Sequence, residues 1–369
     1  MIPLEYYLKP GSLAALGFGA MRMPDLNETK KMIDMFLDGG YNFFDTAWIY
    51  GGSEERLKEA LVKRHSRDKF FLADKLPPWE IKKHPEDSDK LFKEQLRRTG
   101  LSYFDYYLVH SLDESREKEV EEKGFFQWVS ELKSKGLVKH MGFSFHGGTA
   151  CLQRYLEKYP EAEFVLLQLN YMDILRGPAG EWLEVANKYN KPIFVMEPVK
   201  GGSLAKLPEA AEKLLKNYAP GRSIASWAIQ YAAGLKGVTC VFSGMSNVEH
   251  VQDNLKTFEN LKPLTNEEMD LLENVLNETS KVASVPCTAC KYCHNDCPLD
   301  INIAECFTLY NEVKRSGQDS DWNRAMMYRA LPEGQRAESC TGCGACLSHC
   351  PQKIDIPDDL KLVADMFKS

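Results

Sequence analysis

Residues Cys287–Pro298 read CTACKYCHNDCP, and residues Cys340–Pro351 read CTGCGACLSHCP. Both stretches follow the pattern C-x2-C-x2-C-x3-C-P with identical spacing. Three thiolates at this spacing on one tight loop can bind three corners of an iron–sulfur cube, and the cysteine before proline binds the other cube of a pair. The two stretches therefore predict a C-terminal domain organised around two 4Fe–4S clusters.

The two predicted ligand sets exchange their last cysteine. One cluster is assigned to Cys287, Cys290, Cys293 and Cys350, and the other to Cys340, Cys343, Cys346 and Cys297. Two tetrahedral zinc sites are the alternative, but such sites usually use two separated C-x2–4-C pairs. Cys306 lies outside both motifs in an apolar helical context, so we expect it to be a buried small hydrophobic residue.

Cysteine usage also divides the chain, because only two of its eleven cysteines precede residue 287. We expect a first domain at residues 1–262, a helical connector at 263–285 and the cluster domain at 286–369. Between the two motifs, residues 298–339 have helical periodicity. This spacing resembles the all-helical ferredoxin domain more than the compact, strand-rich bacterial ferredoxin.

The first 260 residues alternate short β-rich runs with amphipathic helical patterns, which is typical of βα units around a parallel sheet. The runs are Ala15–Gly19, Asn42–Asp45, Phe70–Lys75, Tyr106–His110, Met141–Ser144, Phe164–Gln168, Ile193–Glu197 and Val238–Ser243. Eight such repeats in about 250 residues predict a (β/α)8 TIM barrel. An open doubly wound sheet is the alternative, but its G-x-G-x-x-G fingerprint is absent.

Polar residues end seven of the eight predicted strands: Asp45, Lys75, His110, Ser144, Gln168, Glu197 and Ser243. Active sites of such barrels lie at the carboxyl ends of the strands. We therefore expect these side chains to share one rim and to include the residues that carry the chemistry.

The run Asn42–Gly51, NFFDTAWIYG, resembles the aldo/keto reductase family, together with Lys75 and His110. Further shared motifs are LGFG at 16–19, GFS at 142–144, QLNY at 168–171 and the segment from Gly244 to Asn254. The resemblance spans residues 4 to about 280. With the cysteine-rich tail, the chain is similar to the aldo/keto reductases that carry a C-terminal ferredoxin domain.

The resemblance implies a catalytic tetrad of Asp45, Tyr50, Lys75 and His110. Reduction of a carbonyl by hydride leaves an alkoxide that needs a proton, and Tyr50 would supply it as general acid. A free tyrosine has a pKa of about 10, and an adjacent ammonium lowers that value. We expect Lys75, held by Asp45, to lower the pKa of Tyr50, and His110 to donate a hydrogen bond to the substrate oxygen.

The resemblance also implies a nicotinamide cofactor, NAD(H) or NADP(H). The matching positions are Gly19, Asp45, Ser144, Gln168, Met196, Glu197, Ser243, Gly244, Ser246, Asn247 and Asn254. Ser144 and Gln168 would bind the carboxamide, and Ser243 to Asn254 the adenosine end. Met196 or Glu197 replaces an aromatic residue, and His250 stands where many members have an arginine for the 2′-phosphate, so the choice between the two nicotinamides stays open.

Composition restricts the partners. The formal charge of −7, from 46 basic and 53 acidic residues, argues against a nucleic-acid or anionic-membrane partner. The chain lacks a long uncharged apolar run and an export signal, so we expect it in the cytoplasm. The expected partners are a small carbonyl or alcohol substrate and a ferredoxin-like or flavoprotein redox partner.

The main hypothesis is hydride transfer in the barrel, coupled to electron transfer through the clusters. Hydride carries two electrons whereas a cluster accepts one, so direct exchange would need a flavin, which is a further candidate cofactor. The alternatives are flavin-mediated electron transfer between NAD(P)H and a ferredoxin-like partner, a non-catalytic nicotinamide-binding redox sensor, and an enzyme whose clusters are structural.

Overall fold

A computed structural model describes residues 14–259, 261–282, 285, 287, 293–294, 297–315, 321–350 and 354–368. The chain groups into two compact units, Met1–Lys200 with Ser226–Thr265, and Gly201–Ala225 with Asn266–Ser369. The domain boundaries drawn from the sequence at residues 262 and 286 stay a prediction.

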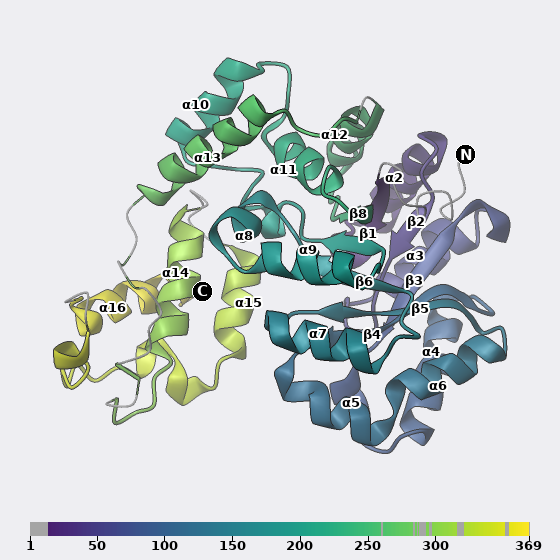
Figure 1. Ribbon diagram of the computed structural model, residues 1–369, viewed down its shortest axis with the longest axis horizontal. Helices are drawn as coiled ribbons and strands as arrows, with labels where there is room; N and C mark the ends of the chain where they lie inside the picture. The colour runs from purple at the N-terminus through teal and green to yellow at the C-terminus, as the bar shows by residue number, and fades with distance from the viewer. Residues whose placement is uncertain are drawn as a thin grey trace. The chain divides into compact units, whose positions relative to one another are not determined.

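Eight parallel strands close into a barrel in chain order, each pairing with the next and the last with the first (Figure 1). The strands are β1 Ala15–Gly19, β2 Phe43–Asp45, β3 Phe71–Leu76, β4 Phe104–Leu112, β5 Val138–Phe145, β6 Phe164–Gln168, β7 Ile193–Met196 and β8 Val238–Ser243. The predicted TIM barrel is confirmed, and each predicted run overlaps one strand.

Large aromatic residues fill the inside of the barrel. The rings of Phe43 and Tyr106 lie 4.7 Å apart, and those of Phe43 and Phe242 lie 4.8 Å apart. Gly17 on β1 makes room for them, since a Cβ added there would lie 2.3 Å from the Phe242 ring. Bulky side chains therefore fill the interior of the barrel. The polar residues lie at the carboxyl ends of its strands.

Helices cover the outside of the barrel: α2 Leu26–Asp38, α3 Ser53–Leu57, α4 Glu86–Thr99, α5 Glu117–Lys123, α6 Phe125–Ser134, α7 Thr149–Lys158, α8 Tyr171–Arg176, α9 Ala179–Lys188, α11 Ile224–Ala233 and α12 Val248–Glu259. Capping side chains stabilise the start of several of these helices. The Asp25 carboxylate, for example, caps α2 by accepting a hydrogen bond from the backbone N–H of Asn27. After α3, residues Lys58–Val62 form a π-helical turn.

The second unit contains α10 Glu209–Tyr218, which packs against α13 Asn266–Ser280, and the tail helices α14 Ile303–Arg315, α15 Trp322–Ala330 and α16 Ile356–Phe367 (Figure 1). A small apolar core around Phe307, Tyr328 and Val363 joins the tail helices. Cys306 is fully buried in this core, as predicted, and burial raises the pKa of its thiol to about 12. The tail is therefore a helical domain, as the spacing of the motifs predicted.

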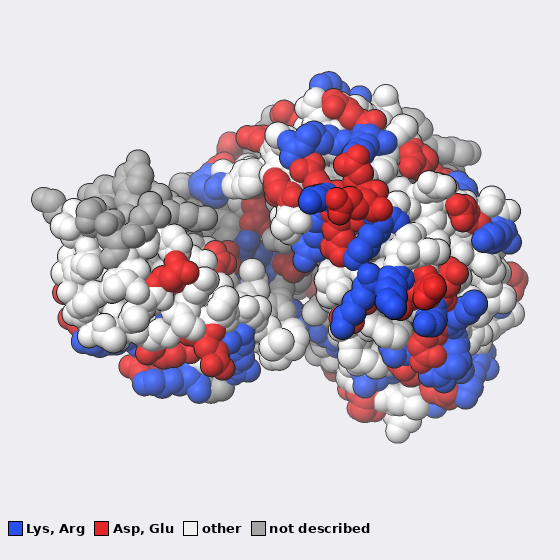
Figure 2. Space-filling model, turned by 90° about the horizontal axis from the view of Figure 1, so that it is seen from below, with Lys and Arg blue, Asp and Glu red and all other residues white. Residues whose placement is uncertain are grey.

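Charged side chains of both signs are intermingled over the face shown in Figure 2. Ion pairs also join neighbouring helices, such as that of Arg154 on α7 with Glu117 on α5. Among the described residues, no helix is long and apolar enough to cross a membrane.

Candidate functional site

Three of the four tetrad residues predicted from the sequence meet around one buried ammonium group. Lys75 is the fifth residue of β3 and is fully buried. Its Nζ donates to the Asp45 carboxylate at 2.7 Å, to the Thr46 carbonyl at 2.6 Å and to the Tyr50 hydroxyl at 3.4 Å. Asp45 ends β2, so the parallel pairing of β2 with β3 sets this geometry.

The buried Asp45 carboxylate and Lys75 ammonium stabilise each other's charged forms. Burial acts to lower the pKa of Lys75, but the charges of Asp45 and Tyr50 together raise it above its ordinary value. Burial raises the pKa of Asp45, and Lys75 opposes this shift. Lys75 is therefore a fixed positive charge at the bottom of the rim.

Burial of Tyr50 and the charge of Lys75 act in opposite directions on the pKa of the tyrosine. The charge and hydrogen bond of Lys75 lower it, as predicted, but burial of the phenol is the larger effect and the net pKa is raised. The charges of Asp45 and Glu197 also raise it. Lys75 thus acts in the expected direction, and the sequence did not show how strongly the phenol is desolvated.

His110 lies beside the tyrosine, near the end of β4. Its ring stands edge-on to that of Tyr50, with centroids 6.1 Å apart, and it also contacts Trp79 at 5.4 Å. Burial lowers the pKa of His110 well below its ordinary value, and the charge of Lys75 adds to this effect. The ring is therefore neutral, and its Nδ1 finds no partner among the described residues.

The positions expected to bind the carboxamide lie on neighbouring strands. Ser144 on β5 is buried, and its Oγ accepts from the backbone N–H of Ser111 at 2.7 Å. Gln168 at the end of β6 donates to Asp173 at 2.9 Å. Met196 ends β7, and Glu197 follows it with a left-handed φ of 52°.

The positions expected at the adenosine end follow β8. Ser243 is buried and accepts from the buried Asn254 side chain at 2.7 Å. Asn247 caps α12 by accepting from the backbone N–H of His250 at 2.8 Å, and the His250 ring accepts from the backbone N–H of Ser246 at 3.2 Å. The Asn254 side chain is therefore bonded to the end of β8. The hydrogen bonds of Asn247 and His250 lie at the start of α12.

Two positions of this expected set form a close backbone approach. A Cβ at Gly19 would lie 3.2 Å from the Ser243 carbonyl oxygen and 3.4 Å from the Gly244 nitrogen. Because Gly19 has no side chain, the end of β1 can lie close to the end of β8. The Ser144 hydroxyl and the Gln168 amide lie on the paired strands β5 and β6 of the same barrel.

Several rim residues were not found by sequence reasoning. Asp173 accepts from Asn170 at 2.7 Å and from the buried ammonium of Lys200 at 2.5 Å. Trp79 and Arg116 stand near His110, with the Arg116 guanidinium 5.1 Å from the centre of the Trp79 ring. Asn170 lay inside a quoted motif, but the lysine and aspartate are 27 residues apart and had no pattern to connect them.

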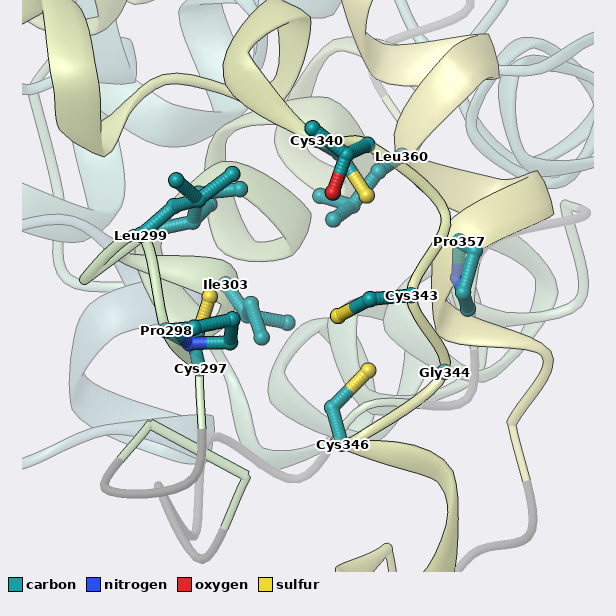
Figure 3. Close-up of a pocket in the computed structure, with 12 residues that line it drawn as sticks. Cys297, Pro298, Leu299, Ile303, Cys340, Cys343, Gly344, Cys346, Pro357 and Leu360 are labelled. Carbon is teal, nitrogen blue, oxygen red and sulfur yellow. The ribbon is translucent and has the colours of Figure 1, made fainter.

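In the tail, the four cysteines of one predicted ligand set line a single cavity. Cys297, Cys340, Cys343 and Cys346 line one cavity, whose apolar walls include Leu299, Ile303 and Leu360. Figure 3 shows the sulfur atoms of Cys340, Cys343 and Cys346 turned toward this space, across from Cys297. The space between the thiols fits a cluster, in which each thiolate binds a different iron atom.

The other predicted set is described only in part, because Cys290 lies outside the described residues. Cys293 is buried, and Cys287 and Cys350 are half-buried against the tail core. In the described ranges, no three or more His, Cys, Asp or Glu side chains gather closely enough to bind one metal ion.

Comparison with known proteins identifies both parts of the chain. The sequence profile of the aldo/keto reductase family matches residues 15–277. The chain belongs to the aldo/keto reductase family. A 4Fe–4S dicluster domain profile matches residues 286–354. This aldo/keto reductase is therefore an oxidoreductase with an added iron–sulfur domain, and both resemblances drawn from the sequence are confirmed.

Relatives of this aldo/keto reductase cover mainly the barrel. An uncharacterised oxidoreductase of Bacillus subtilis, YqkF, is 23% identical over 71% of this chain and 92% of its own. The holo form of an aldo-keto reductase from Bacillus halodurans is 25% identical, with a TM-score of 0.59 over 71% of this chain and 92% of its own. A Klebsiella pneumoniae aldo/keto reductase in complex with NADP and acetate shares the fold, with a TM-score of 0.59 at 20% identity over 71% of this chain and 91% of its own.

Proposed function

We propose that the barrel of this oxidoreductase interconverts a carbonyl and an alcohol by hydride transfer with NAD(H) or NADP(H). The contacts of the Lys75 ammonium with Asp45 and Tyr50 carry the proposal. A nicotinamide bound at the rim would supply or accept the hydride. The Ser144 hydroxyl and the Gln168 amide would hold its carboxamide, and the segment from Ser243 to Asn254 its adenosine end.

The proposed roles follow from the charge state of each group. In the reductive direction, the substrate carbon gains hydride, its oxygen becomes an alkoxide, and the Tyr50 O–H gives its proton to that oxygen to form the alcohol. Lys75 stabilises the phenolate that remains, because its ammonium lies 3.4 Å from the hydroxyl. The neutral His110 ring would donate an N–H to the substrate oxygen and orient it.

The tail would hold two 4Fe–4S clusters, one of them in the cavity of Cys297, Cys340, Cys343 and Cys346. The clusters would carry electrons one at a time between the enzyme and a ferredoxin-like or flavoprotein partner. A flavin would convert between the two-electron and the one-electron step.

Tyr50→Phe tests the proton-transfer role, with Tyr41→Phe as the control. The substitution removes only the hydroxyl, so we expect kcat for carbonyl reduction to fall by about 10²–10⁴-fold while nicotinamide binding is kept. Tyr41 lies in the helix-packing core, at 5.8 Å from the Phe258 ring. Unchanged turnover of every carbonyl and alcohol substrate by Tyr50→Phe would remove the tetrad from the mechanism.

The visible spectrum of anaerobically purified protein tests the coupling. We expect NADH or NADPH to bleach the iron–sulfur absorption if hydride and cluster chemistry are linked. Absorption that dithionite bleaches but neither nicotinamide changes would favour clusters that are structural or that serve a separate route.

A further inference from the structure

Two buried carboxyl groups, one on β3 and one on α3, lie outside the site described above. Asp74 precedes Lys75 on β3 and is fully buried. Glu54 lies in the first turn of α3, four residues after Tyr50, and is 2% exposed. Each carboxyl group thus lies close in the sequence to a proposed catalytic residue: Asp74 to Lys75, and Glu54 to Tyr50.

Each carboxyl group has one oxygen engaged with a donor and one without. Asp74 Oδ1 accepts from the backbone N–H of Lys75 at 2.8 Å, and Glu54 Oε2 accepts from the Arg98 guanidinium at 3.1 Å. Asp74 Oδ2 and Glu54 Oε1 are buried and find no donor among the described residues. The two side chains lie within hydrogen-bonding reach of each other.

A single proton between the two free oxygens would satisfy both. Two carboxylates in contact and away from water cannot both stay ionised, so one of them takes up a proton. The Arg98 guanidinium favours the ionised form of Glu54, which leaves Asp74 as the acid. The other charged or titratable groups around the pair are Lys75, Tyr107, Glu55 and Glu94.

The pKa directions agree with this assignment. Burial raises the pKa of Asp74 well above its ordinary value, and the charge of Glu54 raises it further. Burial also raises the pKa of Glu54, but the hydrogen bond with Asp74 and the contact with Arg98 oppose that shift.

We propose that Asp74 and Glu54 share one proton, and that this acid–carboxylate pair is a positioning element that fastens the turn carrying Tyr50 to the strand carrying Lys75. The role rests on the proposed function of those two residues. Arg98 strengthens the same connection, because its guanidinium binds Glu54 and also stacks on the ring of Trp48, 3.7 Å from the ring centre.

The back of the strand is held by neutral groups as well. The Gln95 amide donates to the Lys75 carbonyl at 3.0 Å and its oxygen accepts from the Tyr107 hydroxyl at 2.6 Å. These bonds fix β3 against α4 without a shared proton. The Asp74–Glu54 pair adds a second connection, from β3 to the helix that follows Tyr50, beside the direct contact of Lys75 with the Tyr50 hydroxyl.

The shared proton can be tested without enzyme activity, on the full chain with its clusters. Infrared spectra at neutral pH should contain the carbonyl stretch of a protonated carboxylic acid that Asp74→Asn removes. The exposed control Glu59→Gln should retain it. Survival of this band in Asp74→Asn would overturn the shared proton.

Unfolding in urea gives a second measure. Between the ordinary pKa of aspartate, about 4, and the raised pKa of folded Asp74, the folded chain holds a proton that the unfolded chain has lost. The unfolding constant of the wild type should therefore rise with pH by up to about tenfold per unit more steeply than that of Asp74→Asn. Equal slopes would also overturn the shared proton.

The positioning role is tested by comparing two substitutions of Asp74. Asn keeps an N–H donor toward Glu54, so Asp74→Asn should retain kcat, whereas Asp74→Ala should lower kcat by on the order of 10–100-fold with little change in KM. Equal kcat values for the two variants would overturn positioning. If the wild-type protein turned over no carbonyl or alcohol substrate, the proposed function would be refuted. The infrared and urea measurements would still decide whether Asp74 and Glu54 share a proton.

Discussion

Replacing Lys75 by methionine should destabilise the protein far more than replacing an equally well-paired lysine at the surface. Lys75 is fully buried and contacts the Asp45 carboxylate at 2.7 Å. Lys63 contacts Glu59 at 2.5 Å, but these two side chains are 56% and 44% exposed. Removing one partner of a buried pair costs about 3–5 kcal/mol, whereas an exposed pair contributes about 0–1 kcal/mol.

The cost of Lys75→Met should depend on pH. Without the ammonium, burial raises the pKa of Asp45 further, and a proton taken up by folded Asp45 relieves the uncompensated charge. The loss of unfolding free energy relative to the wild type should therefore shrink as pH falls toward that raised pKa. The double variant Asp45→Asn with Lys75→Met should regain much of the stability, because no buried charge is left.

Urea unfolding followed by fluorescence measures these differences at constant cluster content. The reasoning would be refuted if Lys75→Met cost no more than Lys63→Met at neutral pH, or if its cost grew as the pH was lowered. The first result would mean that water reaches the pair in solution. The second would mean that Asp45 does not carry the unpaired charge.

Three further predictions concern the cavity, the histidine and the barrel interior. Cys343→Ser should lose about half of the protein-bound iron and Cys306→Ser should lose none, as measured by iron analysis and by the spectrum of the reduced protein. Because the pKa of His110 is well below its ordinary value, kcat should show no histidine titration between about pH 6 and 7, and a step there that His110→Gln removes would contradict this. Gly17→Ala places a Cβ 2.3 Å from the Phe242 ring and should cost about 1–3 kcal/mol, while Gly51→Ala, with nothing within 4 Å, should avoid this steric cost; equal urea midpoints would disprove the clash.

Much of the barrel was predictable because seven of the eight predicted strands are short runs closed by a polar residue. The lengths of β4 and β5 were not, since their ends depend on pairing between strands, such as Leu112 with Phe145. The π-helical turn at Lys58–Val62 also had no glycine or proline to indicate it. Strand positions are therefore local properties of the sequence, whereas strand ends and helix irregularities arise from contacts in the fold.

The candidate site divides in the same way. Asp45 and Lys75 were expected at one rim because both end predicted strands, and their side chains do lie 2.7 Å apart. Their grouping with Tyr50 and His110 into a catalytic tetrad is implied by the family resemblance and stays a prediction. The sharing of Asp173 between Asn170 and Lys200 was not, because it depends on two loops meeting at the rim. The direction of the Tyr50 pKa also needed the structure, since the opposing effects of burial and the Lys75 charge depend on depth and distance.

The raised pKa of Tyr50 determines which protonation state the proposed general acid has before the reaction. A phenol with a raised pKa keeps its proton at neutral pH, and His110 with a lowered pKa stays uncharged. The charges of Lys75 and Asp45 then balance each other, so the four side chains together carry no net charge while Tyr50 keeps its proton. Hydride arriving at a carbonyl would create a negative oxygen in this setting, and proton transfer from Tyr50 would leave the phenolate next to the Lys75 ammonium. A Tyr50 that keeps its proton agrees with the general-acid role proposed for it in carbonyl reduction.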